Sequence, residues 1–193
     1  MRYTPEHAEA THARVLEASG RQFRLHGFSG IGVDGLARAA KVTSGAFYNH
    51  FGSKAAAFAA VVTNGVGRVG AGMALARRAY GARWLRASAA YYLGADHRRD
   101  VAGGCTLPSL SAEVSRADEA TRRAYEVELT NAAGLIADGL PGAPDRTTAW
   151  PILAQLVGGV LLSRAVYDED LANEIADAVL ASVLSSEEIL SRD

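Results

Sequence analysis

The stretch from 40 to 54 constrains this chain more than any other, because it predicts a helix too short to stand alone. It reads as a tight turn, a very short helix, a second turn and the start of a longer helix. Phe47 and Phe51 are four residues apart and share one helix face, which predicts that both rings point into a core. An isolated helix of this length is unstable in water, so packing must hold it in place.

The remaining positions of the short helix are polar. Thr43 is the expected N-cap, with its hydroxyl accepting a hydrogen bond from the amide of Gly45 or Ala46. Ser44, Asn49 and their neighbours are then expected to face outward. A short helix that is anchored by aromatic rings and presents polar groups is suited to entering a groove of DNA. An ordinary corner between two helices of an all-α protein is the alternative.

The segment before this helix favours the DNA-binding alternative. An apolar stripe of Val33, Leu36, Ala37 and Ala40 predicts another short helix, and only residues 41–43 separate the two. Two short helices joined by so short a turn are typical of a helix-turn-helix, whose second helix enters the major groove.

Three motifs make the match specific: Gly27-Phe28, the run Val33–Ala37, and the run Val42–Lys54. Together they resemble the DNA-binding domain of TetR-family transcriptional regulators over about residues 10–62. The resemblance implies a homodimer that binds a palindromic operator and a C-terminal body that binds a small effector. Ile31 and Gly32 depart from it, since the family usually has Thr or Ser there to cap the helix and contact a phosphate.

The resemblance and the helix geometry together assign the DNA contacts. Tyr48, His50 and Lys54 are predicted at phosphates. Ser44 and Asn49 are predicted at base edges, because Asn can read adenine through a bidentate pair. Gly45 is expected to allow close approach of the backbone. The full predicted DNA-binding set is Thr43, Ser44, Gly45, Tyr48, Asn49, His50 and Lys54.

Charge is uneven along the 193 residues. Residues 1–55 hold seven Lys or Arg against four Asp or Glu, a net charge of +3, and the whole chain carries −1, so the remainder carries −4. The only two lysines, Lys41 and Lys54, flank the proposed recognition helix. A basic first third joined to an acidic body is consistent with a DNA-facing module, although chance unevenness is an alternative. Arg14, Arg21 and Arg24 are expected on the solvated face of the first helix.

The whole chain is predicted to be all-α with about nine helices, in two domains at 5–54 and 55–193. Alanine is abundant and proline scarce, which favours helices. The first helix is expected to end at His26. A long helix over about 55–78 is expected to bend or break between Gly65 and Gly72, because interior glycines weaken helices. Residues 96–104 are expected to form a loop.

The last two predicted helices, over about 147–167 and 168–184, are unusually apolar. The predicted dimer-interface residues are Leu153, Leu156, Val157, Val160, Leu171, Ile175 and Val179. The resemblance implies that these helices form a four-helix bundle with a second subunit. Burial of all of them inside one monomer is the alternative.

Aromatic residues mark a candidate effector pocket. Tyr80, Trp84 and Tyr91 have the spacing of one helical face, and Cys105, Tyr125 and Trp150 are the other candidate lining residues. A plain hydrophobic core is the alternative. Cys105 follows two glycines and is either a core thiol or a sensor of electrophiles or oxidants, which would require a lowered thiol pKa.

Other classes of function lack their motifs. The sequence has no Gly-x-x-x-x-Gly-Lys loop, no His-Glu-x-x-His and no Cys-x-x-Cys, so no catalytic residues, cofactor or metal are predicted. One cysteine and the lack of a signal-peptide run favour a cytoplasmic protein. We therefore predict a sequence-specific, ligand-responsive repressor of transcription. A ligand-independent regulator, a helical protein–protein adaptor and a small bundle enzyme are the alternatives.

Overall fold

The computed structural model describes residues 5–142 and 145–190, and it confirms the all-α prediction. The described residues form ten α-helices and one 3₁₀ turn, close to the number expected. In chain order the elements are α1 (Pro5–His26), α2 (Val33–Ala39), α3 (Ser44–Phe51), α4 (Lys54–Tyr80), η1 (Gly81–Arg83), α5 (Trp84–Leu93), α6 (Ala95–Arg99), α7 (Thr106–Val114), α8 (Glu119–Ala137), α9 (Arg146–Ala165) and α10 (Glu169–Leu190).

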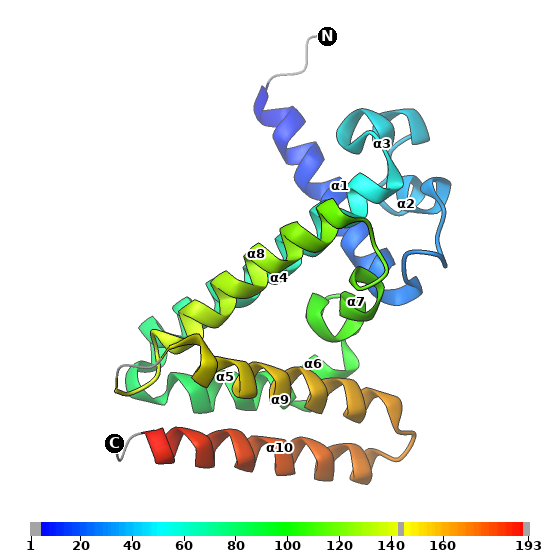
Figure 1. Cartoon of the computed structure of the whole chain (residues 1–193). Coiled ribbons are helices and arrows are strands. Elements are labelled where there is room, and N and C mark those ends of the chain that lie inside the picture. Colours follow the sequence, from blue (N-terminus) through cyan, green and yellow to red (C-terminus); the bar gives the residue numbers. More distant parts are fainter. Residues whose placement is uncertain (1–4, 143–144, 191–193) are drawn as a thin grey trace.

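The three N-terminal helices pack around a small aromatic core at one end of the molecule (Figure 1). Phe23 of α1 and Phe28 of the following turn both contact Phe58 of α4, with ring centroids 5.3 and 5.1 Å apart. Leu110 and Val114 of α7 close this core from the side of the body. The helix-turn-helix is therefore held by α4 and α7 as well as by its own residues.

Helix α4 runs without interruption from Lys54 to Tyr80, so a break near its glycines, one of the two predicted outcomes, does not occur. The glycines serve close packing instead. A Cβ at Gly65 would lie 2.0 Å from Thr106 Oγ1, and one at Gly70 would lie 2.7 Å from a methyl group of Leu135. Close approach of α7 and α8 to α4 needs these small residues, and the packing outweighs their low helix propensity.

The turn at Gly81 ends α4 in a left-handed conformation, with a φ of 52°. Tyr80 therefore closes one helix while Trp84 and Tyr91 lie on the next, and the three do not share one helical face as the spacing suggested. By length and composition alone, the stretch Lys54–Leu93 would pass as a membrane span, as the apolar core helices of soluble proteins also do. In the fold this stretch is two helices packed against the body (Figure 1).

The predicted loop at 96–104 contains a single helical turn, α6, which corrects that prediction. Arg98 of α6 is buried and donates to Asn173 of α10, so contacts with a distant helix hold the turn. Helices α9 and α10 run side by side at the end of the molecule opposite α3 (Figure 1). The main core of the body lies between α9, α10, α5 and the α4–α8 pair.

Candidate nucleic-acid interface and effector cavity

Helix α3 is fixed at both ends by its own residues. The Thr43 hydroxyl caps it as predicted, accepting from the amide of Ala46 at 3.1 Å. At the other end Gly52 adopts a φ of 74°, and its amide donates to the Tyr48 carbonyl. Phe47 is fully buried and its ring lies 5.4 Å from that of Phe51, so the predicted aromatic anchor is confirmed.

The outward face of α3 is polar and accessible. Tyr48 is 49% exposed and Asn49 is exposed, while His50 is partly covered by the ring of His12 of α1, 5.6 Å away. The Ser44 hydroxyl donates to Asp34 of α2 at 2.6 Å. That bond holds α3 against α2 and leaves an oxygen lone pair of Ser44 free to accept, so Ser44 has a positioning role that the sequence did not indicate.

Gly45 needs no special backbone conformation and is not required by packing. A Cβ built there would meet nothing closer than Thr43 Oγ1 at 3.9 Å. The space beside Gly45 is therefore solvent, on the outward face of the helix. This arrangement is suited to the close approach of another molecule's backbone.

Lys54 opens α4, whose N-cap is Ser53, with the Ser53 hydroxyl accepting from the amide of Ala56 at 3.0 Å. The Lys54 ammonium lies 4.4 Å from the centre of the Phe28 ring, a cation–π contact. Phe28 in turn donates its amide to both carboxylate oxygens of Glu113 in α7. The Phe28 ring therefore connects Lys54, just after the C-terminal end of α3, to α7 of the body.

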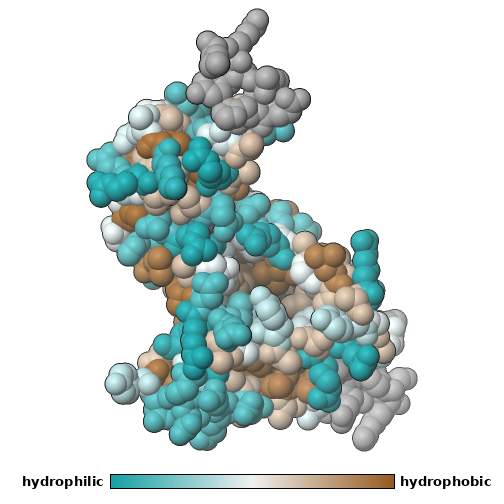
Figure 2. Space-filling model, turned by 180° about the vertical axis from the view of Figure 1, so that it is seen from behind, coloured by the Kyte–Doolittle hydropathy of each residue, from teal (hydrophilic) through white to brown (hydrophobic). Residues whose placement is uncertain are grey.

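A second candidate site is a cavity of about 470 Å³ between α4, α5, the end of α1 and the loop before α7. This volume lies within the range of about 300–1,000 Å³ that is usual for small-molecule sites. Figure 2 views the molecule from behind and shows hydrophobic residues in the recess between the N-terminal helices and the body.

Three of the six predicted pocket residues, Tyr80, Tyr91 and Cys105, line this cavity. Trp84 does not, because its indole is buried in the core and donates to the Gly139 carbonyl at 2.9 Å.

The other two predicted residues lie elsewhere. Tyr125 hydrogen-bonds Ser111 at 2.8 Å beside a different surface hollow, and Trp150 is 36% exposed on α9. Helical spacing predicts which residues share a face of one helix, but it cannot predict which faces of different helices meet around a cavity.

Burial raises the pKa of the Cys105 thiol. Its sulfur accepts from the Leu107 amide at 3.4 Å and so caps α7. A thiol with a raised pKa is protonated near neutral pH and is a weak nucleophile. These features favour a structural role for Cys105 over the sensor alternative.

The residues predicted at the dimer interface fall into two groups. Leu153, Leu156 and Val160 are buried within the single chain, at 5% exposure or less, so that part of the prediction is corrected. Val157, Ile175 and Val179 are partly covered, and Leu171 is 42% exposed. Leu161 and Leu162, which are not among the predicted interface residues, are more than half exposed on α9. The outer stripe of α9 consists of Trp150, Ala154, Gly158, Leu161, Leu162 and Ala165.

Comparison with known proteins agrees with this geometry. Residues 15–61 match the family model described as bacterial regulatory proteins, tetR family. The crystal structure of reduced Escherichia coli NemR superposes with a TM-score of 0.76 at 22% identity, covering 91% of this chain and 97% of that one. No curated protein sequence matches the chain.

Two further solved structures show the same fold over nearly the whole chain. A TetR-family regulator from Cytophaga hutchinsonii has a TM-score of 0.74 at 19% identity, covering 95% of this chain and 98% of that one. SCO4454 from Streptomyces coelicolor, another TetR-family regulator, has a TM-score of 0.70 at 20% identity, covering 95% and 97%. Residues 15–61 are therefore similar to the DNA-binding region of tetR-family regulatory proteins, and the whole chain has the fold of these solved TetR-family regulators.

Proposed function

We propose that the protein is a ligand-responsive repressor that binds a palindromic operator in the cytoplasm as a homodimer. The observation that carries the proposal is the outward face of α3, where Tyr48 and Asn49 are exposed on a helix anchored by the buried ring of Phe47. A rigid helix with exposed hydrogen-bonding side chains can read base edges without losing much conformational freedom on binding.

In this proposal Asn49 and Ser44 contact bases, while Tyr48, His50 and Lys54 contact phosphates. Thr43 positions the first turn of α3, and Gly45 lets the backbone approach the duplex. The proposal keeps the two domains predicted from the sequence, a DNA-binding part at 5–54 and a body at 55–193.

Dimerisation is proposed through the outer faces of α9 and α10. Leu161 and Leu162 are 51% and 58% exposed, and Leu171 on α10 is 42% exposed. Ala154 and Gly158, two turns and one turn before Leu161 on α9, are small and permit close approach of a second pair of helices. A two-fold axis there brings two copies of α3 to successive major grooves, about 34–36 Å apart.

The ligand response is proposed as a shift between two arrangements of the dimer. A ligand in the cavity favours an arrangement in which the two α3 helices no longer match the groove spacing. It must bind that arrangement more tightly than the DNA-bound one, because a ligand with equal affinity for both shifts nothing.

The test is selection of bound sequences from random duplex DNA by the purified protein, followed by footprinting of the enriched site. The expected result is an inverted repeat with half-sites about 10 base pairs apart, protected by two chains. An enriched site without two-fold symmetry would contradict dimeric reading, and absence of any enrichment would contradict sequence-specific binding. An operator affinity that no compound changes would leave a ligand-independent regulator.

A further inference from the structure

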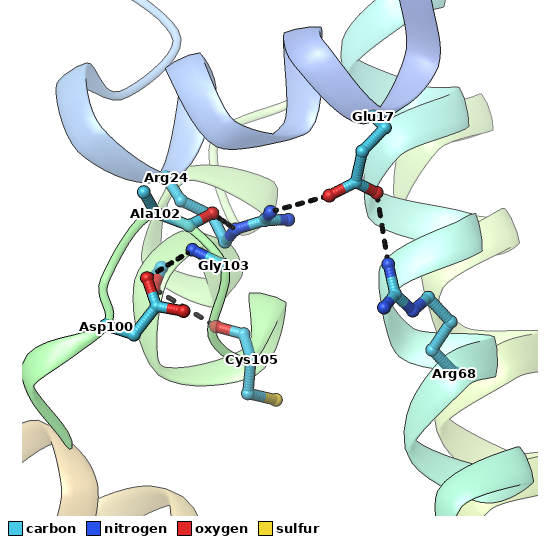
Figure 3. Close-up of polar contacts among 8 residues, drawn as sticks. Glu17, Arg24, Arg68, Asp100, Ala102, Gly103 and Cys105 are labelled. Atoms are coloured by element: carbon cyan, nitrogen blue, oxygen red, sulfur yellow. Dashed lines mark hydrogen bonds and ion pairs between the residues drawn. The ribbon is translucent and has the colours of Figure 1, made fainter. Parts of the chain in front are cut away.

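Arg24 lies inside the fold and not on the solvated face of α1 where the sequence placed it. Its side chain is only 6% exposed, and its Nε donates to the Ala102 carbonyl at 2.6 Å, in the loop that leads to Cys105. Figure 3 shows its guanidinium between that loop and Glu17. Arg24 also lines the effector cavity, so α1 contributes a cation directly to the cavity wall.

The charge of Arg24 is poorly compensated. The nearest carboxylate oxygen, on Glu17, is 3.8 Å from Arg24 Nη2, which is too far for a hydrogen bond. Glu17 is half exposed and is bound more closely by Arg68, at 3.1 Å (Figure 3). Two arginines therefore share one carboxylate, and burial lowers the pKa of Arg24. A buried cation without a full partner is costly, which favours binding of an anion beside it.

The described residues of the cavity wall carry positive charge and apolar surface. Its described lining residues include both arginines but no aspartate or glutamate, and most of the others are apolar or aromatic, among them Val69, Met73 and Tyr91. Tyr92 also lines this wall: the residue is 91% buried, and its hydroxyl faces the Cys105 thiol. The cavity therefore combines an apolar surface with a net positive charge and a buried phenol.

We infer that the cavity binds an organic anion with an apolar or aromatic body, whose acidic group takes the place of Glu17 beside Arg24 and Arg68. Its role as an effector rests on the proposed ligand response, but the binding chemistry does not. Because Arg24 belongs to α1 and is tied to the Ala102 carbonyl, an anion at this position acts on the N-terminal helices and on the loop before α7 at once. Arg24 is the residue through which the ligand would reach the helix-turn-helix.

The test compares two fluorescent probes that share one apolar body. 8-Anilino-1-naphthalenesulfonate carries an anionic group, and N-phenyl-1-naphthylamine is the same anilinonaphthalene without it. Titrations with the full-length folded protein should give one anionic probe bound per chain, with an affinity at least about tenfold above that of the neutral probe, since hydrogen bonds between charged groups provide this discrimination.

Variants assign the discrimination to the two arginines. Arg24→Gln and Arg68→Gln should each weaken binding of the anionic probe by about tenfold and leave the neutral probe unchanged. Arg21→Gln, on an exposed residue one turn before Arg24, is the matched control and should change neither affinity. Far-UV circular dichroism checks that Arg24→Gln is folded. Arg68 is 64% exposed, so its variant tests the site even if Arg24→Gln unfolds.

Equal affinities for the two probes, or an anionic-probe affinity that neither variant changes, would overturn the inference. Selection from random duplexes is carried out separately and without probe. Specific DNA binding with no discrimination between probes would leave the proposed DNA-binding function in place and remove the anion site. Discrimination between the probes without specific DNA binding would support the anion site and contradict the proposed DNA-binding function.

Discussion

The molecule exposes two helical surfaces at opposite ends, and they differ in chemistry. The outward face of α3 presents the phenol of Tyr48 and the amide of Asn49, together with the hydroxyl of its N-cap, Thr43. The outer stripe of α9 presents Leu161, Leu162 and small apolar residues. Each surface is anchored from behind by a buried face of its own helix, Phe47 in α3 and Leu156 in α9.

The difference indicates how each surface is used. Water solvates the polar face of α3 well, so that face needs no partner when the protein is free and suits a contact that forms and breaks. An apolar stripe left in water forgoes about 25 cal/mol for each Å² that a partner would cover, which favours a lasting contact. We expect the α9 surface to be covered by a second copy whether or not DNA is bound.

The largest expected effect comes from a charge in the apolar stripe. Leu161→Glu should convert the dimer into monomers, because two carboxylates would be buried near the two-fold axis without partners. Operator affinity should then fall by about 100-fold or more, since the second half-site no longer binds as part of one molecule. Analytical ultracentrifugation and fluorescence anisotropy with an operator duplex measure the two effects.

The matched control for that variant is Val127→Glu, at an apolar residue of α8 that is 57% exposed. It adds the same charge outside the α9 stripe and should leave both mass and operator affinity unchanged. If Leu161→Glu stayed dimeric, the proposed interface would be wrong. If Val127→Glu also gave monomers, the interface would extend over α8.

The next effect concerns base reading by α3. Asn49→Ala should lower operator affinity by about tenfold or more and relax the base preference at one position in each half-site, because a bidentate pair contributes about 1–3 kcal/mol of discrimination. Asn131→Ala, an exposed asparagine of α8, is the control. Competition binding with operators mutated at single positions measures it. A uniform loss over all operators would assign Asn49 to the backbone instead.

Features that depend on neighbouring residues could be predicted from the sequence, whereas features that depend on contacts far along the chain could not. The cap of Thr43 and the anchor of Phe47 follow from neighbours within one turn, and both were predicted. The roles of Gly65 and Arg24 depend on Thr106 and Ala102, which are far along the chain. Periodicity along one helix cannot identify which distant helix or loop will pack there.

The apolar helices illustrate the same limit. The pattern of α9 correctly indicated a strongly apolar helix, but it did not separate the face packed on α5 and α10 from the outer one. Leu153, Leu156 and Val160 went to the core of the single chain, and Leu161 and Leu162 to the surface. Only the tertiary fold decides between the two faces when both are apolar.

A smaller effect concerns salt, because DNA binding by the α3 surface should depend on salt concentration and dimerisation through the α9 surface should not. Lys54→Ala should weaken binding to every duplex alike and lower the slope of log affinity against log salt by about one unit for each chain in the dimer. The dissociation constant of the dimer should change little between about 50 and about 200 mM salt, because its contact is apolar. Lys54→Met keeps an unbranched side chain beside Phe28 but removes the charge, so a slope lowered as much as in Lys54→Ala would assign the effect to the phosphate contact and not to packing on Phe28. An unchanged slope in Lys54→Ala would remove Lys54 from the phosphate contacts.

The smallest expected effect is a dependence of the free energy of unfolding of the body on pH. Burial lowers the pKa of His97, although its Nδ1 lies 2.6 Å from the Tyr92 carbonyl, and that contact opposes the shift. The folded chain keeps this ring neutral at a pH where the unfolded ring, with a pKa near 6.5, takes up a proton. The unfolded state then binds more protons, so the free energy of unfolding falls as pH drops below about 6.5.

Thermal unfolding at about pH 7.5 and about pH 5.5 measures this effect. The share due to His97 should not exceed about 2–4 °C in Tm, the shift that about 1 kcal/mol produces in a domain of this size. His97→Gln keeps a donor for the Tyr92 carbonyl and removes the titration, so its Tm should fall less between the two pH values than that of the unaltered chain. Equal losses in both proteins would mean that protonation of His97 does not destabilise the body. A smaller loss in the variant would place this pH response in the part of the molecule that carries the apolar surface, away from α3.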